Sequence, residues 1–254
     1  MPKPNTARAS TLASPYRVAS DEVHVWCARL DVPAETSARL YATLAVEERN
    51  RSARFRFQRD RRHFIVAHGV LRNLLGHYLK TEPSRIGFVY QAFGKPDLSP
   101  WFGGRLKFNL SHSAGLALIA IAAESNVGVD LEYIRAQSDY AELARHFFSA
   151  AEVGQLSVLP DHLFTEAFLG CWTKKEAYVK ARGCGLALPL RSFTVPLASD
   201  PEQGPATLLV APNDVDQAMR WSIHTLRPAP GYIGALAIQG CGWRLSQWEW
   251  KMRS

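Results

Sequence analysis

Residues 105–122, RLKFNLSHSAGLALIAIA, and residues 220–239, RWSIHTLRPAPGYIGALAIQ, resemble one another. Each reads as a strand, a turn and an apolar strand, because alternating residues lead into a short polar segment and then into an apolar run. A repeated unit of this kind predicts two similar halves that meet near residue 125. Two unrelated hairpins would give the same pattern, so the repeat alone leaves the duplication open.

The segments around the first hairpin combine strand and helix patterns. Period-two alternation predicts strands at 23–30 and 126–132, and helical patterns follow near 138–158 and 162–182. A long amphipathic helix is expected from about residue 54, with arginines at its start that face away from its apolar stripe. The stripe comprises Phe57, Phe64, Ile65, His68, Leu71, Leu74, Leu75 and Tyr78. The fold class expected is therefore α+β.

The chain is expected to have a disordered tail at residues 1–20, an N-terminal half at 21–125 and a C-terminal half at 126–254. The tail has no apolar core followed by a cleavage site, so it does not read as a secretory signal. The longest apolar run, residues 116–123, is far shorter than the roughly 20 residues of a membrane span. The four cysteines form no Cys-x-x-Cys pair. We expect a soluble, cytoplasmic protein with reduced cysteines.

The positive charge is concentrated in one segment. The net charge is +7, and between Arg49 and Arg62 there are seven arginines against one acidic residue. Such a segment suits nucleic acid, an anionic cofactor or an acidic protein partner. A nucleic-acid-binding module is one candidate, since phenylalanines are interleaved with these arginines. Against it, no known binding motif is present and the carboxylates described next would repel a phosphate backbone.

Two carboxylates share one face of the strand at 126–132. Side chains alternate along a strand, so Asp130 and Glu132 point away from the apolar Val127, Val129 and Leu131. Adjacent carboxylates repel one another unless a cation or a proton lies between them, and hard oxygen ligands favour Mg²⁺ or Mn²⁺ over zinc. An exposed strand face that carries acids would look the same.

A second group lies on the predicted helix at 162–182. Trp172, Glu176 and Lys180 are four residues apart and so lie on one face, and Gly183 ends the helix as a left-handed cap would. An ordinary surface pair of glutamate and lysine has the same spacing.

The third group is Asn109-Leu110-Ser111-His112-Ser113, where a strand runs into a turn. His112 could contact phosphate, accept a proton or cap the turn. A serine hydrolase pair is set aside, because no Gly-x-Ser-x-Gly segment is present and adjacent strand residues point apart.

Five ordered segments together resemble the surfactin-type 4'-phosphopantetheinyl transferase family. They are FGKP at 93–96, FNLSHS at 108–113, GVDLE at 128–132, RHFFSAAE at 145–152 and WTKKEAYVKARGCGL at 172–186. The resemblance covers most of the chain from about residue 45 to 195. It implies two pseudo-symmetric α+β halves with the active site at their interface.

The resemblance also implies the roles of individual residues. The Mg²⁺ ligands would be Asp130, Glu132 and Glu176. The phosphates of coenzyme A would be contacted by Lys95, Ser111 and His112, with Lys180 on the departing diphosphate. Guanidinium groups bind phosphate bidentately, so the candidates for the 3'-phosphate are Arg51, Arg54 and Arg62. Members of the family often carry a basic residue at the position of Glu48, which leaves the 3'-phosphate contacts open.

The implied reaction is attack by a serine of an acyl, peptidyl or aryl carrier protein on the β-phosphoryl group of coenzyme A. Adenosine 3',5'-bisphosphate would leave, and Glu176 would take the serine proton directly or through water. Mg²⁺, Lys180 and His112 would neutralise the developing charge. The partner would be acidic and would dock transiently on a monomeric enzyme. The alternative is a Mg²⁺-dependent hydrolase of coenzyme A or a related diphosphate.

Overall fold

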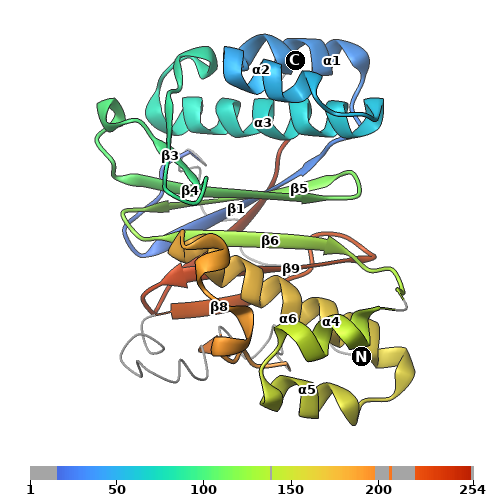
Figure 1. The fold of residues 1–254 in the computed structure, drawn as a ribbon. Helices are drawn as coiled ribbons and strands as arrows, with labels where there is room; N and C mark the ends of the chain where they lie inside the picture. The colour runs from blue at the N-terminus through green and yellow to red at the C-terminus, as the bar shows by residue number, and fades with distance from the viewer. Residues whose placement is uncertain (1–15, 138, 198–205, 208–220, 253–254) are drawn as a thin grey trace, which may run out of the picture.

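Two four-stranded sheets lie face to face, and helices cover their outer faces (Figure 1). This computed structural model describes residues 16–137, 139–197, 206–207 and 221–252. The first sheet has the strand order β10-β1-β5-β4, and the second has the order β6-β9-β8-β7. The α+β class and the two halves expected from the sequence are therefore confirmed.

The first half contains β1 (Glu22–Arg29), α1 (Ala34–Thr43), α2 (Val46–Ala53), α3 (Gln58–Leu79), β2 (Phe88–Tyr90), β3 (Pro96–Leu98), β4 (Leu106–Ser113) and β5 (Leu116–Ala123). The second contains β6 (Val127–Tyr133), α4 (Tyr140–Phe147), α5 (Ala150–Ser157), α6 (Asp161–Arg182), β7 (Ala206–Thr207), β8 (Trp221–Leu226) and β9 (Tyr232–Gln239), followed by β10 (Arg244–Glu249).

The two halves share one topology. The repeated stretches of sequence form the antiparallel hairpins β4–β5 and β8–β9. In each sheet the second strand of the hairpin lies between its first strand and the strand that opens the half, giving β1-β5-β4 and β6-β9-β8. The 22-residue helices α3 and α6 take equivalent places (Figure 1).

Two predicted helices have different boundaries. The arginine-rich segment is divided between two helices: α2 ends at Ala53, and α3 begins at Gln58 and carries only the last three of these arginines. The helix expected at 138–158 is two helices, because Ser149 starts a new one. The Ser149 hydroxyl accepts from the Glu152 amide, and the Glu152 carboxylate accepts from the Ser149 amide at 2.8 Å. This reciprocal cap stabilises a fresh N-terminus.

The ends of the chain depart from the predicted division. Strand β10, expected in the C-terminal half, pairs in parallel with β1 and so belongs to the first sheet. The expected tail at 1–20 lies mostly outside the described residues, but its Tyr16 stacks on Trp26 with the ring centroids 5.5 Å apart. The halves are thus joined by an exchanged strand as well as by the chain between them.

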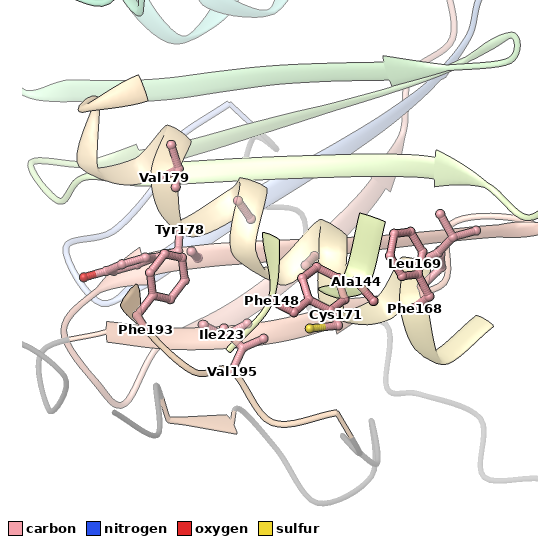
Figure 2. Packing of buried hydrophobic residues seen from close by; sticks show 14 of the residues in the cluster. Ala144, Phe148, Phe168, Leu169, Cys171, Tyr178, Val179, Phe193, Val195 and Ile223 are labelled. Atoms are coloured by element: carbon pink, nitrogen blue, oxygen red, sulfur yellow. The ribbon is translucent and has the colours of Figure 1, made fainter. Parts of the chain in front are cut away.

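Three apolar cores hold the layers together. One lies between α3 and the first sheet, and another between α6 and the second sheet, where Phe148, Phe168 and Phe193 pack (Figure 2). The third lies between the sheets and contains Val25, Leu118, Val129 and Leu236. Because the sheets share a core, β4 and β6 are held side by side. Among the described helices, none is long and apolar enough to span a bilayer.

Candidate active site

The candidate site begins at the seam between β4 and β6. Alternate residues of β4 point at β6, as the period of a strand requires. The Asn109 side chain accepts from the Val129 amide at 2.9 Å, the Ser111 hydroxyl donates to Asp130 at 2.9 Å, and the Ser113 hydroxyl donates to Glu132 at 3.0 Å. Two of the motifs singled out in the sequence are therefore in direct contact.

Helix α6 approaches β6 closely because residue 128 is a glycine. A side-chain carbon at Gly128 would overlap the backbone of Ala177 and Ala181. This approach lets the Lys180 ammonium donate to Asp130 at 2.6 Å and to the Ser111 hydroxyl at 3.1 Å. The carboxylates of the strand and the catalytic face of the helix thus meet, as the resemblance implied.

The three predicted metal ligands, Asp130, Glu132 and Glu176, share one electrostatic environment. Burial and the negative charge of Asp130 raise the pKa of both Glu132 and Glu176. Asp130 is 5% exposed, and its Oδ2 atom is buried without a hydrogen-bond partner among the described residues. These observations fit a cation that would satisfy Oδ2 and relieve the repulsion.

The carboxylates are nevertheless not gathered in ligand geometry. Within the described part of the chain, no three His, Cys, Asp or Glu side chains are placed to hold a metal ion together. Lys180 supplies the positive charge beside Asp130 instead. A metal would therefore require the side chains to rearrange around Lys180.

His112 lies at the exposed end of the seam, surrounded by positive groups. Desolvation by the neighbouring protein, followed by the charges of His68, His63, Lys180 and Arg51, lowers the pKa of His112 to about 4. The imidazole is therefore neutral near pH 7. We call these four residues and His112 the basic group. Its combined charge favours the binding of an anion there.

Two of these groups, His63 and His68, were not assigned a role from the sequence. The His63 ring nitrogen Nε2 lies 2.9 Å from Asp31, and His68 Nδ1 lies 3.1 Å from Glu48. His68 was counted in the apolar stripe of the helix. Only the tertiary partners of the two rings distinguish them from core histidines.

The predicted phosphate-binding arginines differ in their placement. Arg51, in the last turn of α2, lies over the Phe64 ring at 5.3 Å and contributes to the positive field at His112. Arg54 follows the end of α2, Arg62 lies near the start of α3, and both are exposed. All three arginines are exposed, and Arg51 is the one whose charge acts on His112.

Lys95 does not point at the basic group. Its ammonium donates to the carbonyl oxygens of Val127 and Ala181, each at 3.1 Å. Burial lowers the pKa of Lys95 to about 8. The contact with phosphate stays a prediction, and the ammonium is hydrogen-bonded here to these two carbonyls.

A cleft of about 710 Å³ opens beside the seam. Glu176 and Lys180 line it together with Trp172, which places the predicted helix face in one cavity. Its apolar walls are formed by Phe93, Leu110, Phe147, Val179 and Leu188. The cleft therefore combines apolar walls with the Glu176 carboxylate and the Lys180 ammonium, and Lys180 connects it to Asp130 and Ser111 at the seam.

Comparison with known proteins identifies the family. The chain is 40% identical to the 4'-phosphopantetheinyl transferase HetI of Nostoc sp. over 232 residues, which cover 91% of this chain and 93% of the relative. The chain belongs to the 4'-phosphopantetheinyl transferase superfamily. Two family models match it in succession, the N-terminal 4'-phosphopantetheinyl transferase model at residues 33–126 and the superfamily model at 126–230.

More distant relatives carry the same description. The 4'-phosphopantetheinyl transferase Sfp of Bacillus subtilis is 30% identical over 166 residues, 65% of this chain and 72% of the relative. AcpT of Escherichia coli is 37% identical over 112 residues, 44% of this chain and 55% of the relative. This chain is a transferase that moves 4'-phosphopantetheine onto carrier proteins, which confirms the resemblance and favours transfer over the hydrolase and nucleic-acid alternatives.

Proposed function

We propose that this transferase uses coenzyme A as donor, depends on Mg²⁺ or Mn²⁺, and releases adenosine 3',5'-bisphosphate. The observation that carries the proposal is the seam of β4 and β6. It places Asp130 beside Ser111 and Lys180, between the basic group at His112 and the apolar cleft.

Asp130, Glu132 and Glu176 would hold the metal. Their hard oxygen donors suit Mg²⁺, and the buried, unpartnered Oδ2 of Asp130 is available for a cation. When bound, the metal would supply neutralisation of the negative charge on the phosphoryl oxygens. Displacement of Lys180 from Asp130 would free its ammonium for the substrate.

The phosphates would lie along the basic side of the seam. Lys180 donates to the Ser111 hydroxyl and adds to the positive field at His112, so it is the group best placed for the diphosphate. Arg51 and His68 lie farther out, on α2 and α3, and suit the 3'-phosphate. His68 donates through Nδ1 to the Glu48 carboxylate, which leaves Nε2 as the ring nitrogen that could contact an anion. Lys95, Arg54 and Arg62 are weaker candidates on these contacts.

Glu176 is the proposed general base. A serine hydroxyl is too weakly acidic to attack unaided, and the Glu176 carboxylate, which lines the cleft, can accept its proton directly or through water. The carrier serine would attack the β-phosphoryl group while Glu176 takes its proton. Lys180 would donate to the oxygen of the departing bisphosphate. One new oxygen–phosphorus bond replaces the diphosphate linkage.

The carrier is proposed to be an acidic acyl, peptidyl or aryl carrier domain that docks transiently at the mouth of the cleft. The net charge of +7 favours an acidic partner. Because both halves of the site lie in one chain, we propose a monomer. The cytoplasmic location stays a prediction from the sequence.

The test is the intact mass of an apo carrier domain after incubation with the protein, coenzyme A and Mg²⁺. We expect a mass gain of one phosphopantetheine that is absent with a chelator and absent with Glu176→Ala. Restoration of the gain by Mg²⁺ after chelation would support the metal requirement. Cleavage of coenzyme A without any mass gain would identify a hydrolase instead.

A further inference from the structure

The side chain of Lys95 crosses from one half of the molecule to the other. It lies in the connection between β2 and β3, in the first half. Its ammonium donates to the carbonyl of Val127, the first residue of β6, and to that of Ala181, in the last turn of α6. Both acceptors belong to the second half, so one side chain joins a loop to the strand and the helix that carry the proposed reacting groups.

The acceptors are suited to a cation. The last four carbonyls of a helix have no partner within the helix, and the partial negative charge of the helix dipole gathers there. Gly183, with φ 65°, turns the chain away at this end. A side-chain carbon at Gly183 would lie 3.5 Å from Cδ of Lys95, so the aliphatic stem packs against the cap.

We propose that Lys95 is a positioning residue that fastens the β2–β3 loop to the end of α6, rather than a ligand of coenzyme A. The contact would hold α6 in the register that sets Glu176 and Lys180 against Asp130. This inference rests on the proposed roles of Glu176 and Lys180. The contact of Lys95 with the second half does not depend on those roles, because it is present in the protein without substrate.

The charged groups around Lys95 are consistent with hydrogen bonds that are already formed without substrate. Asp97, two residues away, is paired with Lys107 at 2.8 Å. Asp97 and the Cys184 thiol raise the pKa of Lys95, whereas burial and Lys107 lower it, and burial dominates. Burial disfavours the charged form of the Lys95 ammonium, and the hydrogen bonds to the two carbonyls offset this penalty.

The first test is hydrogen exchange on the protein without coenzyme A. In Lys95→Met we expect amides at 181–187 and in the β2–β3 loop to exchange about tenfold faster, because a charge-assisted contact at a helix end is lost. The matched control is Lys107→Met, which removes a positive charge from the neighbouring strand and should leave exchange at 181–187 unchanged. Unchanged exchange in Lys95→Met would overturn the proposal.

Kinetics separate the tie from a phosphate contact. Misplacement of α6 should lower kcat of Lys95→Met about tenfold and change KM for coenzyme A less than about threefold. A rise in KM at constant kcat would make Lys95 a ligand and refute the proposal. If the wild-type protein transfers nothing, the proposed function fails, yet the exchange result still decides whether the tie exists.

A measurement on the wild-type protein covers the case in which the variant does not fold. An amine-reactive acylating reagent, mapped by peptide mass, should label Lys95 at the same rate with and without coenzyme A, because the contact with the two carbonyls does not depend on the ligand. Protection that arises only when coenzyme A is added would show that Lys95 binds the ligand and would overturn the tie.

Discussion

In the first half Glu48 of α2 pairs with Arg72 of α3, and in the second half Glu152 of α5 pairs with Lys175 of α6. Each glutamate caps its own short helix by accepting a backbone amide, from Ala45 or Ser149. Each cation also donates to two carbonyls in the segment that follows its long helix. Each half therefore contains a buried pair of glutamate and cation that fixes its long helix to the neighbouring segments.

The two pairs of glutamate and cation differ in their other contacts. The pair in the second half is 0% exposed on both sides, and its cation donates to Leu190 and Phe193. In the first half Glu48 is shared with His68, which faces the basic group. One half thus uses its glutamate to orient His68, the proposed binding group. The other half buries its glutamate completely and carries the proposed reacting groups, Glu176 and Lys180, farther along α6. On the proposed roles, binding and chemistry are divided between the two halves.

Loss of the fully buried pair of Glu152 and Lys175 should have the largest effect. Lys175→Met leaves the buried Glu152 carboxylate without its cation, and we expect the free energy of unfolding to fall by about 3–5 kcal/mol. Arg72→Met should cost less, because His68 remains as a partner for Glu48. Chemical denaturation of both variants measures the difference. An equal loss would mean that His68 does not compensate.

Next in size is the effect of removing the proposed base. Glu176→Ala should lower kcat by at least about a hundredfold, since both a base and a metal ligand are lost. The mass-gain assay provides the rate, and far-ultraviolet circular dichroism checks the fold. Near-normal turnover by a folded variant would refute the role of Glu176 and the division between the halves.

A smaller effect is expected at the binding half. His68→Asn retains a donor for Glu48 but loses the second ring nitrogen, so KM for coenzyme A should rise about threefold to tenfold with kcat unchanged. The matched substrate is 3'-dephospho-coenzyme A, for which the variant and the wild type should agree. An equal rise with both substrates would place His68 elsewhere than at the 3'-phosphate.

The smallest effect concerns the carrier. Docking of an acidic partner on a chain of net charge +7 should weaken severalfold between low and physiological salt, because screening shortens the reach of surface charges. KM for the carrier as a function of sodium chloride measures it. A KM that does not respond to salt would remove electrostatic steering from the proposal.

Local patterns located much of the site. The alternation around Gly128 placed Asp130 and Glu132 on one face, and the spacing of four placed Glu176 with Lys180, as the structure has them. The same reasoning did not find the contacts that Lys95 and His68 make within the protein. Their partners are 20 or more residues away in the sequence, and no period along the chain encodes such contacts.

The sequence by itself predicted the strands at 23–30 and 126–132, the two long helices to within a few residues, the repeated hairpin and the family, because periodicity and ordered motifs are properties of neighbouring residues. Only the tertiary structure decided that β4 lies against β6, that β10 crosses to the first sheet, and that Lys95 ends at two carbonyls. The reason is physical. The hydrophobic effect that buries the common core of the two sheets has no preferred direction. Which faces meet is therefore decided by the close packing of side chains from distant parts of the chain.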